Sequence, residues 1–141
     1  MVSVGLYGFG KTGKVVAAEL LAEDDISLEW VVRGSSATSH KYASRLVGYE
    51  DNRGEIFAAA ELTADFFDTH PVDVIIDFSH SAGVHTYKAA AGKGMAIVSA
   101  ISKYEQEDLD TLMGLSKNTA VLFSPNITLG VNFLLIASQV L

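Results

Sequence analysis

A glycine motif separates an apolar run, Val2–Tyr7, from a stretch of helical periodicity at residues 12–22, and its members are Gly8, Gly10 and Gly13. The spacing is G-x-G-x-x-G, and a position between a strand and a helix is typical of a tight βα turn. In such a turn the first glycine allows the sharp change of direction, and the third lets the helix lie close to the strand. The chain is therefore predicted to begin with a strand and a helix that pack against each other.

Short runs rich in Val and Ile alternate with helical stretches along the rest of the chain, which predicts repeated βαβ units. The expected strands are Val2–Tyr7 and residues 28–33, 72–77, 95–99 and 120–124, and the expected helices are residues 12–22, 81–93 and 105–117. Ser102 and Glu105 have the spacing of a capping box for the last of these helices. The predicted fold class is therefore α/β, a Rossmann-type, doubly wound and mostly parallel sheet in three layers.

Two segments follow this pattern less closely. Residues 34–67 are irregular, with short helices expected near residues 40–46 and 64–68. Residues 130–141 are strongly apolar with helical periodicity, and a helix of this kind packs on a partner surface. We therefore expect self-association through this helix and a homo-oligomer.

The composition limits the classes of partner. A chain of 141 residues with 49% apolar and 19% charged side chains can bury one core. Its formal net charge of -7 disfavours nucleic acid and an anionic membrane surface as the main partner. The sequence contains no cysteine, and no apolar run approaches the roughly 18 residues of a membrane span. We expect a soluble cytoplasmic protein of one domain with a small-molecule partner.

The glycine motif admits two functional interpretations beside that of a simple turn. As a dinucleotide-binding loop, it lets a pyrophosphate approach the backbone at Gly10 and rest on the N–H groups that begin the helix. The candidate contacts are then Gly8, Phe9, Gly10, Lys11, Thr12 and Gly13. As a phosphate loop of nucleoside triphosphatases, the segment from Gly5 to Thr12 fits G-x-x-x-x-G-K-T. That register would leave only residues 1–4 for the first strand, so the dinucleotide interpretation is favoured.

Arg33 stands at the end of the second predicted strand, where NAD-binding domains usually carry an Asp or Glu for the adenosine ribose. A guanidinium can instead bind the 2′-phosphate of NADP in a bidentate manner, and Ser35 and Ser36 add hydroxyl donors. The alternative is a solvated arginine without a ligand. NADP(H) is therefore the expected cofactor, and NAD(H) is kept as the second choice.

The third predicted strand ends in Asp77, Phe78 and Ser79, at the sheet edge where ligands of doubly wound folds bind. Ligand contact and simple capping of the next helix both fit these residues. The histidines lack the spacing of a metal site and are interpreted as surface or loop residues; they are His40, His70, His80 and His85. We find no candidate catalytic residue and no candidate metal site in the sequence.

Three motifs together resemble the amino-terminal part of dihydrodipicolinate reductase. They are GFGKTG at residues 8–13, VDVIIDFSHSAG at residues 72–83 and FSPNITLGVN at residues 123–132. The resemblance spans essentially the whole chain, and the third motif is its most specific part. It implies that Ser124, Pro125 and Asn126 frame a nicotinamide ring, together with Ser99, Ala100 and Ile101. It also implies an NAD(P)-binding Rossmann domain over residues 1–141.

The sequence departs from this family in two places. Ser99, Ala100, Ile101 and Ser102 replace the family's Gly-Thr-Thr-Gly segment. The family's His-His…Lys motif and its Ser-Gly-Thr loop would follow Leu141. The resemblance therefore implies a cofactor-binding domain of a reductase of lysine and diaminopimelate biosynthesis, which acts on a ring C=N of a cyclic dicarboxylate with a further domain. The alternative function is a regulatory nucleotide-sensing Rossmann module without catalysis.

Overall fold

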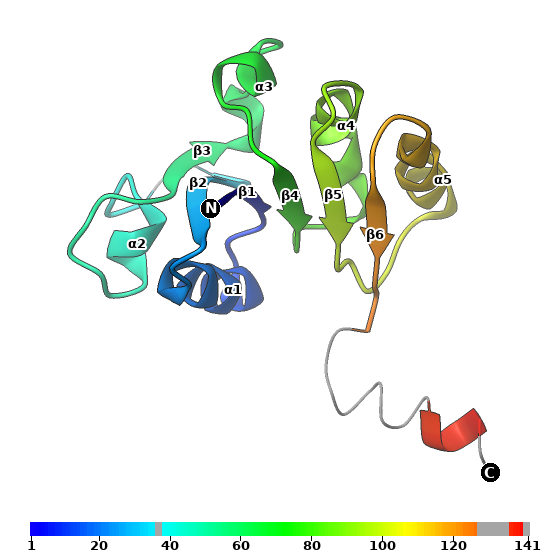
Figure 1. Ribbon diagram of the computed structural model, residues 1–141, viewed down its shortest axis with the longest axis horizontal. Coiled ribbons are helices and arrows are strands. Elements are labelled where there is room, and N and C mark those ends of the chain that lie inside the picture. Colours follow the sequence, from blue (N-terminus) through cyan, green and yellow to red (C-terminus); the bar gives the residue numbers. More distant parts are fainter. Residues whose placement is uncertain (36–37, 127–135, 140–141) are drawn as a thin grey trace.

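The computed structural model describes residues 1–35, 38–126 and 136–139, and its centre is a sheet of six parallel strands (Figure 1). The strands are β1 (Val2–Tyr7), β2 (Ile26–Arg33), β3 (Glu55–Ala58), β4 (Val74–Asp77), β5 (Ala96–Ser99) and β6 (Val121–Phe123). Their order is β3-β2-β1-β4-β5-β6, so the order of the strands reverses between β1 and β4. This order confirms the predicted doubly wound fold of the Rossmann type.

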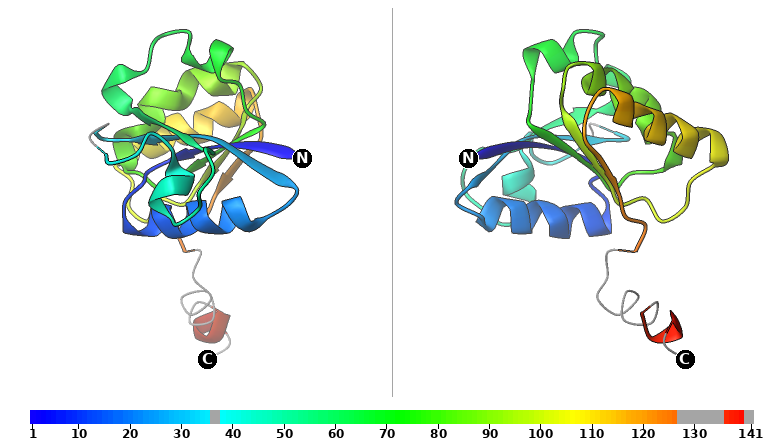
Figure 2. Two further views of the ribbon diagram at one scale, coloured as in Figure 1. Left: turned by 90° about the vertical axis from the view of Figure 1, so that its left-hand side faces the viewer. Right: turned by 45° about the vertical axis from the view of Figure 1, so that its right-hand side comes forward.

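Helices lie on both faces of the sheet (Figures 1 and 2). One face carries α3 (Phe66–Thr69), α4 (Val84–Gly92) and α5 (Gln106–Gly114), and the other carries α1 (Lys11–Ala22) and α2 (Ala43–Leu46). Short 3-10 turns adjoin them at η1 (Ala59–Glu61), η2 (Ser81–Gly83) and η3 (Leu115–Lys117). The helices connect parallel strands, as βαβ units require.

Each face of the sheet has its own apolar core. On the α4 face, Trp30 meets Tyr7 edge-on with ring centroids 5.8 Å apart, and Phe66 at 5.3 Å. Its indole Nε1 donates to the carbonyl of His70 at 3.0 Å, so the polar atom of this buried ring is paired. On the α1 face the core is mostly aliphatic, with Leu6 and Leu20 among its residues.

The α1 face is covered over only part of its width. In the described part of the chain, α1 and α2 lie over β1, β2 and β3, and no helix lies over β5 and β6 (Figure 1). The strand register places Ile76, Val98 and Leu122 side by side on β4, β5 and β6. Leu122 is 59% exposed, and the other two side chains are only partly buried. The sheet therefore presents an apolar strip here.

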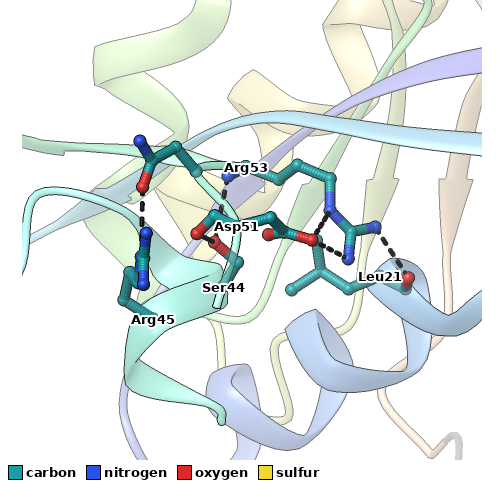
Figure 3. A network of polar contacts seen from close by, with 6 residues as sticks. Leu21, Ser44, Arg45, Asp51 and Arg53 are labelled. Atoms are coloured by element: carbon teal, nitrogen blue, oxygen red, sulfur yellow. Dashed lines mark hydrogen bonds and ion pairs between the residues drawn. The ribbon is translucent and has the colours of Figure 1, made fainter. Parts of the chain in front are cut away.

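A polar network holds the segment between α2 and β3 against the end of α1 (Figure 3). The guanidinium of Arg53 donates to the Leu21 carbonyl at 2.9 Å and to the Asp51 carboxylate at 2.8 Å. The buried hydroxyl of Ser44 accepts from the Arg53 amide and donates to the Asp51 carbonyl, both at 2.9 Å. Arg53 therefore satisfies a carbonyl in the last turn of α1 and places a positive charge at the negative end of its dipole.

Residues 34–67, expected to be irregular with two short helices, also contain the strand β3, which the sequence pattern did not predict. This strand has four residues, and only Ile56 and Phe57 are large and apolar, so no alternation is visible in the sequence. It exists because it pairs along β2, from Trp30 opposite Glu55 to Arg33 opposite Ala58. Tertiary pairing rather than local pattern determines this strand.

The expected capping box of Ser102 and Glu105 is also wrong. α5 begins at Gln106 with Glu105 as its N-cap residue, and the Glu105 amide donates to Ser81 Oγ at 2.8 Å. A side chain from the distant η2 turn thus takes the place of a local cap. The apolar helix expected at residues 130–141 lies outside the described residues, apart from residues 136–139.

Candidate functional site

The three glycines of the motif have three different environments. Gly8 has φ +93°, in the left-handed region that favours glycine, and turns the chain away from β1. A Cβ on Gly13 would lie 2.0 Å from the Gly8 carbonyl oxygen, so only glycine allows α1 to pack this closely on the turn. A Cβ on Gly10 would meet no atom of the described chain within 4 Å. The open space at Gly10 is where a ligand can reach the backbone.

The phosphate-loop interpretation is wrong in this fold. Gly5, which would open that loop, lies inside β1 opposite Trp30, and β1 continues to Tyr7. A Cβ on Gly5 would approach the Trp30 ring to 2.2 Å, so this glycine makes room for a core side chain. The glycine motif therefore begins at Gly8.

The amino terminus of α1 points into the region beside Gly10. Gly10 is the N-cap residue and no side chain caps the helix. The Lys14 amide donates to the Gly10 carbonyl at 3.0 Å, so the amides of Lys11, Thr12 and Gly13 precede the first bond of the helical ladder. These amides and the positive end of the helix dipole form a surface suited to an anion.

A first hollow of about 480 Å³ lies between this turn, the end of β2 and the segment after β4. It is lined by Tyr7, Gly8, Phe9, Gly10, Val32, Arg33, Gly34, Ser35, Ala59, Phe78, Ser79, His80, Gly83 and Thr86. Seven residues expected from the sequence are thus brought together here: Gly8, Phe9, Gly10, Arg33, Ser35, Phe78 and Ser79. Arg33 has no ion-pair partner among the residues that the structure describes. Ser36, expected beside Ser35, lies outside the described residues.

The buried side chain of Asp77 supports the turn that lines this hollow. Its carboxylate is fully buried and accepts hydrogen bonds from the Ser79 amide at 2.8 Å, the Ser79 hydroxyl at 2.6 Å and the Tyr87 hydroxyl at 2.7 Å. Burial raises the pKa of Asp77, and these hydrogen bonds oppose the rise. Asp77 is therefore neither exposed to a ligand nor a cap of α4; it fixes the turn that carries Phe78 and Ser79.

A second hollow of about 480 Å³ lies on the other side of that turn. It is lined by Thr12, Phe78, Ser79, His80, Ser81, Ala100, Ile101, Ser102 and Lys103. The contacts expected from the sequence here are Thr12, Phe78, Ser79, Ala100 and Ile101. Ser102 was named only as part of the departure from the family, and His80, Ser81 and Lys103 were not expected. No motif marks these residues in the sequence, and the only indication of them is that they follow β4 and β5 at the carboxyl edge of the sheet.

The remaining expected residues lie around the two hollows without lining them. Ser99 is fully buried, and its hydroxyl is bonded to the Tyr104 hydroxyl at 2.5 Å. The Ser124 amide donates to the Ser99 carbonyl at 2.9 Å, which places Ser124, Pro125 and Asn126 just beyond β6 at the same sheet edge. Lys11 and Gly13 flank Thr12 in the first turn of α1.

The charge of the two hollows is opposite to that of the chain. Their linings in the described chain include the cations Arg33 and Lys103 and contain no Asp or Glu. The formal net charge of the whole chain is -7. A local excess of positive charge, added to the end of α1, favours an anionic ligand at this edge.

No group of three or more His, Cys, Asp or Glu side chains that could hold a metal ion occurs among the described residues. His85 pairs with Asp108 at 2.7 Å, and His70 stacks on Phe66 with ring centroids 4.7 Å apart. His80 is exposed and borders both hollows. In the same residues, no helix is long and apolar enough to cross a membrane.

Comparisons with known proteins agree with this geometry. The family model described as dihydrodipicolinate reductase, N-terminus, matches residues 2–127. A 4-hydroxy-tetrahydrodipicolinate reductase of Methanothermobacter thermautotrophicus is 28% identical over 140 residues, which cover 94% of this chain and 50% of that protein. The chain therefore spans about half the length of this curated relative.

Solved structures share the fold at low sequence identity. Dipicolinate-bound dihydrodipicolinate reductase from Paenisporosarcina sp. TG-14 matches with a TM-score of 0.64 and 16% identity, over 89% of this chain and 48% of that one. Scyllo-inositol dehydrogenase from Lactobacillus casei with bound NAD(H) and scyllo-inositol matches with a TM-score of 0.65 and 18% identity, over 88% and 36% of the two chains. The fold, the glycine turn and the family model over residues 2–127 lead to one conclusion: the chain belongs to the family of dihydrodipicolinate reductase amino-terminal domains.

Proposed function

We propose that this chain is the cofactor-binding domain of a reductase and that it binds NADP(H) across the two hollows. The open backbone at Gly10, beside the uncapped start of α1, is the observation that carries the proposal. A pyrophosphate at this point has three helix amides within reach and no side chain in its way. In doubly wound folds the residue that ends the second strand contacts the adenosine ribose. The adenosine half therefore belongs in the first hollow and the nicotinamide half in the second.

Arg33 supports a preference for NADP(H) over NAD(H). It ends β2 on the rim of the first hollow, and no ion pair within the described chain occupies its guanidinium. A 2′-phosphate offers the planar, bidentate partner that guanidinium groups bind well. Ser35 lines the same hollow, and we keep Ser36 as a further hydroxyl donor to the phosphate.

The reaction that we propose is hydride transfer to the ring C=N of a cyclic dicarboxylate, as the names of the relatives suggest. The bound nicotinamide supplies the hydride, and this chain binds and orients it. The curated relative is about twice as long as the matched region. We propose that the proton donor and most of the substrate contacts belong to the part of such enzymes that this chain does not span.

A fluorescence titration tests the proposal directly, with NADPH and NADH added separately to the chain. We expect saturable binding of both and tighter binding of NADPH. The absence of NADPH binding would refute the proposed function, and equal affinities would refute the role of Arg33. Binding of AMP or ATP with no gain from the nicotinamide half would support the alternative, a nucleotide-sensing module.

Turnover separates the cofactor-binding role from complete catalysis. Holding two reactants in position contributes about 7–11 kcal/mol to a rate enhancement, and this contribution requires both binding surfaces. We therefore expect NADPH oxidation with dihydrodipicolinate only from a chain that also carries the second half of the relatives. Equal turnover by the 141 residues alone would contradict this division.

A further inference from the structure

The segment that follows β5 is anchored by contacts on both sides of Lys103. The Ala100 amide donates to the Asp77 carbonyl at 2.9 Å, which fixes the segment where it leaves the sheet. After Lys103, the Tyr104 hydroxyl bonds to Ser99, and the Tyr104 ring meets Phe123 edge-on with centroids 5.4 Å apart. The backbone at Lys103 is therefore positioned at the rim of the second hollow.

Within the described chain Lys103 has no carboxylate partner, as is also true of four other lysines, but it is the lysine that lines the second hollow; those four are Lys11, Lys14, Lys88 and Lys117. Lys103 shares the second hollow with the hydroxyl groups of Thr12, Ser81 and Ser102. An unpaired ammonium group beside hydroxyl donors is an arrangement suited to a carboxylate.

Two polar groups near Lys103, the Ser81 hydroxyl and the Asp108 carboxylate, already have partners within the chain. The Ser81 hydroxyl donates to Asp108 at 2.5 Å and accepts from the Glu105 amide at 2.8 Å. Asp108 also pairs with His85 at 2.7 Å, and Asp108 itself does not line the hollow. The polar groups left for a ligand are Lys103, the hydroxyls of Ser102 and Thr12, and the ring of His80, which lines both hollows.

We propose that Lys103, assisted by the Ser102 hydroxyl, binds a carboxylate of the molecule that the nicotinamide reduces. This inference rests on the proposed function, because it requires the nicotinamide half to occupy the second hollow beside Lys103. The acceptor of the hydride must lie against the nicotinamide, and Lys103 lines that hollow together with Thr12 of α1. One carboxylate is bound from this chain, and a second would be bound from outside it.

The pyrophosphate of the dinucleotide is another anion that Lys103 could reach, so the experiment has two arms. The first measures the affinity of the chain and of Lys103→Gln for 2′-phospho-ADP-ribose, which carries the pyrophosphate but no nicotinamide. The second adds dipicolinate to both proteins saturated with NADPH and follows backbone amide shifts by NMR. Pyridine-2,6-dicarboxamide, which has the same ring without charge, controls for stacking on the nicotinamide.

Lys117→Gln is the matched control variant, because Lys117 is an exposed lysine in η3 and lines neither hollow. We expect dipicolinate, but not the dicarboxamide, to give saturable shifts at Ser102 and Lys103. Lys103→Gln should weaken dipicolinate binding about tenfold or more, while Lys117→Gln leaves it unchanged. Binding of 2′-phospho-ADP-ribose should be the same in all three proteins.

Three results would overturn the proposal. They are the absence of dipicolinate shifts in the NADPH complex, dipicolinate binding that survives Lys103→Gln, and a loss of 2′-phospho-ADP-ribose affinity in that variant. The last result would assign Lys103 to the pyrophosphate instead. Failure of NADPH itself to bind would refute the proposed function first, so the two failures are distinguishable.

Discussion

Replacing Gly10 by valine tests the pyrophosphate site while the fold stays intact. Gly10 has φ -81° and ψ -156°, an extended conformation that valine adopts, and a Cβ there meets nothing within 4 Å. The free energy of unfolding should therefore fall by only about 1 kcal/mol, because valine is a poorer N-cap residue than glycine. For a chain of this length, that lowers the melting temperature by about 2–4 °C.

The valine side chain would occupy the space through which a pyrophosphate approaches the amides of α1. Hydrogen bonds to a charged group contribute about 1.5–3 kcal/mol each. Loss of two such bonds weakens NADPH binding by at least about a hundredfold. Gly13→Val is the contrasting variant, because its Cβ would lie 2.0 Å from the Gly8 carbonyl oxygen and should cost the fold itself.

Circular dichroism melting and an NADPH fluorescence titration on the same samples separate the two effects. We expect Gly10→Val to melt near the wild-type temperature without binding NADPH, and Gly13→Val to be unfolded or strongly destabilised. A folded Gly10→Val chain with wild-type affinity would refute the placement of the pyrophosphate. Wild-type melting of Gly13→Val would refute the close packing of α1 on the turn.

Three further variants test other parts of the site. Arg33→Asp should reverse the preference between NADPH and NADH in a fluorescence titration, because a carboxylate repels the 2′-phosphate and accepts from ribose hydroxyls; an unchanged ratio would exclude Arg33 from the contact. Tyr7→Phe removes a buried hydroxyl whose contact with the neighbouring Thr86 lacks the geometry of a hydrogen bond, so its free energy of unfolding in urea should equal or exceed that of the wild type. A clear loss of stability would mean that this hydroxyl has a partner. Asp77→Asn tests the raised pKa of Asp77, because the folded state keeps the proton of this carboxyl to a higher pH than the unfolded state does. The stability that Asp77 contributes is therefore complete below its unfolded pKa and declines as the pH rises through its folded pKa. Urea unfolding at acid and mildly alkaline pH should show a smaller decline in the variant, and an equal decline in both proteins would contradict the assignment.

The first half of the site could be predicted from the sequence because its determinants are local. The spacing of Gly8, Gly10 and Gly13 fixes a turn, a backbone opening and a close helix contact within six residues. Arg33 could be placed because it ends a strand that the apolar pattern marks clearly. These features depend on short-range geometry, so one sequence suffices to read them.

The second half of the site could not be predicted in the same way. Lys103 is an ordinary polar residue in the sequence, and its proposed role depends on the bonds of Ser99, Ala100 and Tyr104, which hold its segment at the hollow. The strand β3 escaped prediction for a related reason, because four residues become a strand only where β2 offers an edge. Both cases depend on contacts between segments that local periodicity does not encode.

The exposed strip at Leu122 lies on β6, an edge strand that we expect to open more readily than the central strands of the sheet. β6 is a three-residue edge strand, and Leu122 finds no helix of the described chain above it. Segments with few buried apolar contacts open locally at a lower free energy than the centre of a sheet. When β6 detaches, Phe123 leaves the ring of Tyr104, and the segment that carries Lys103 loses a support. We therefore expect the segment that carries Lys103 to be more mobile than the glycine turn, so that a second molecule could enter the second hollow from this side.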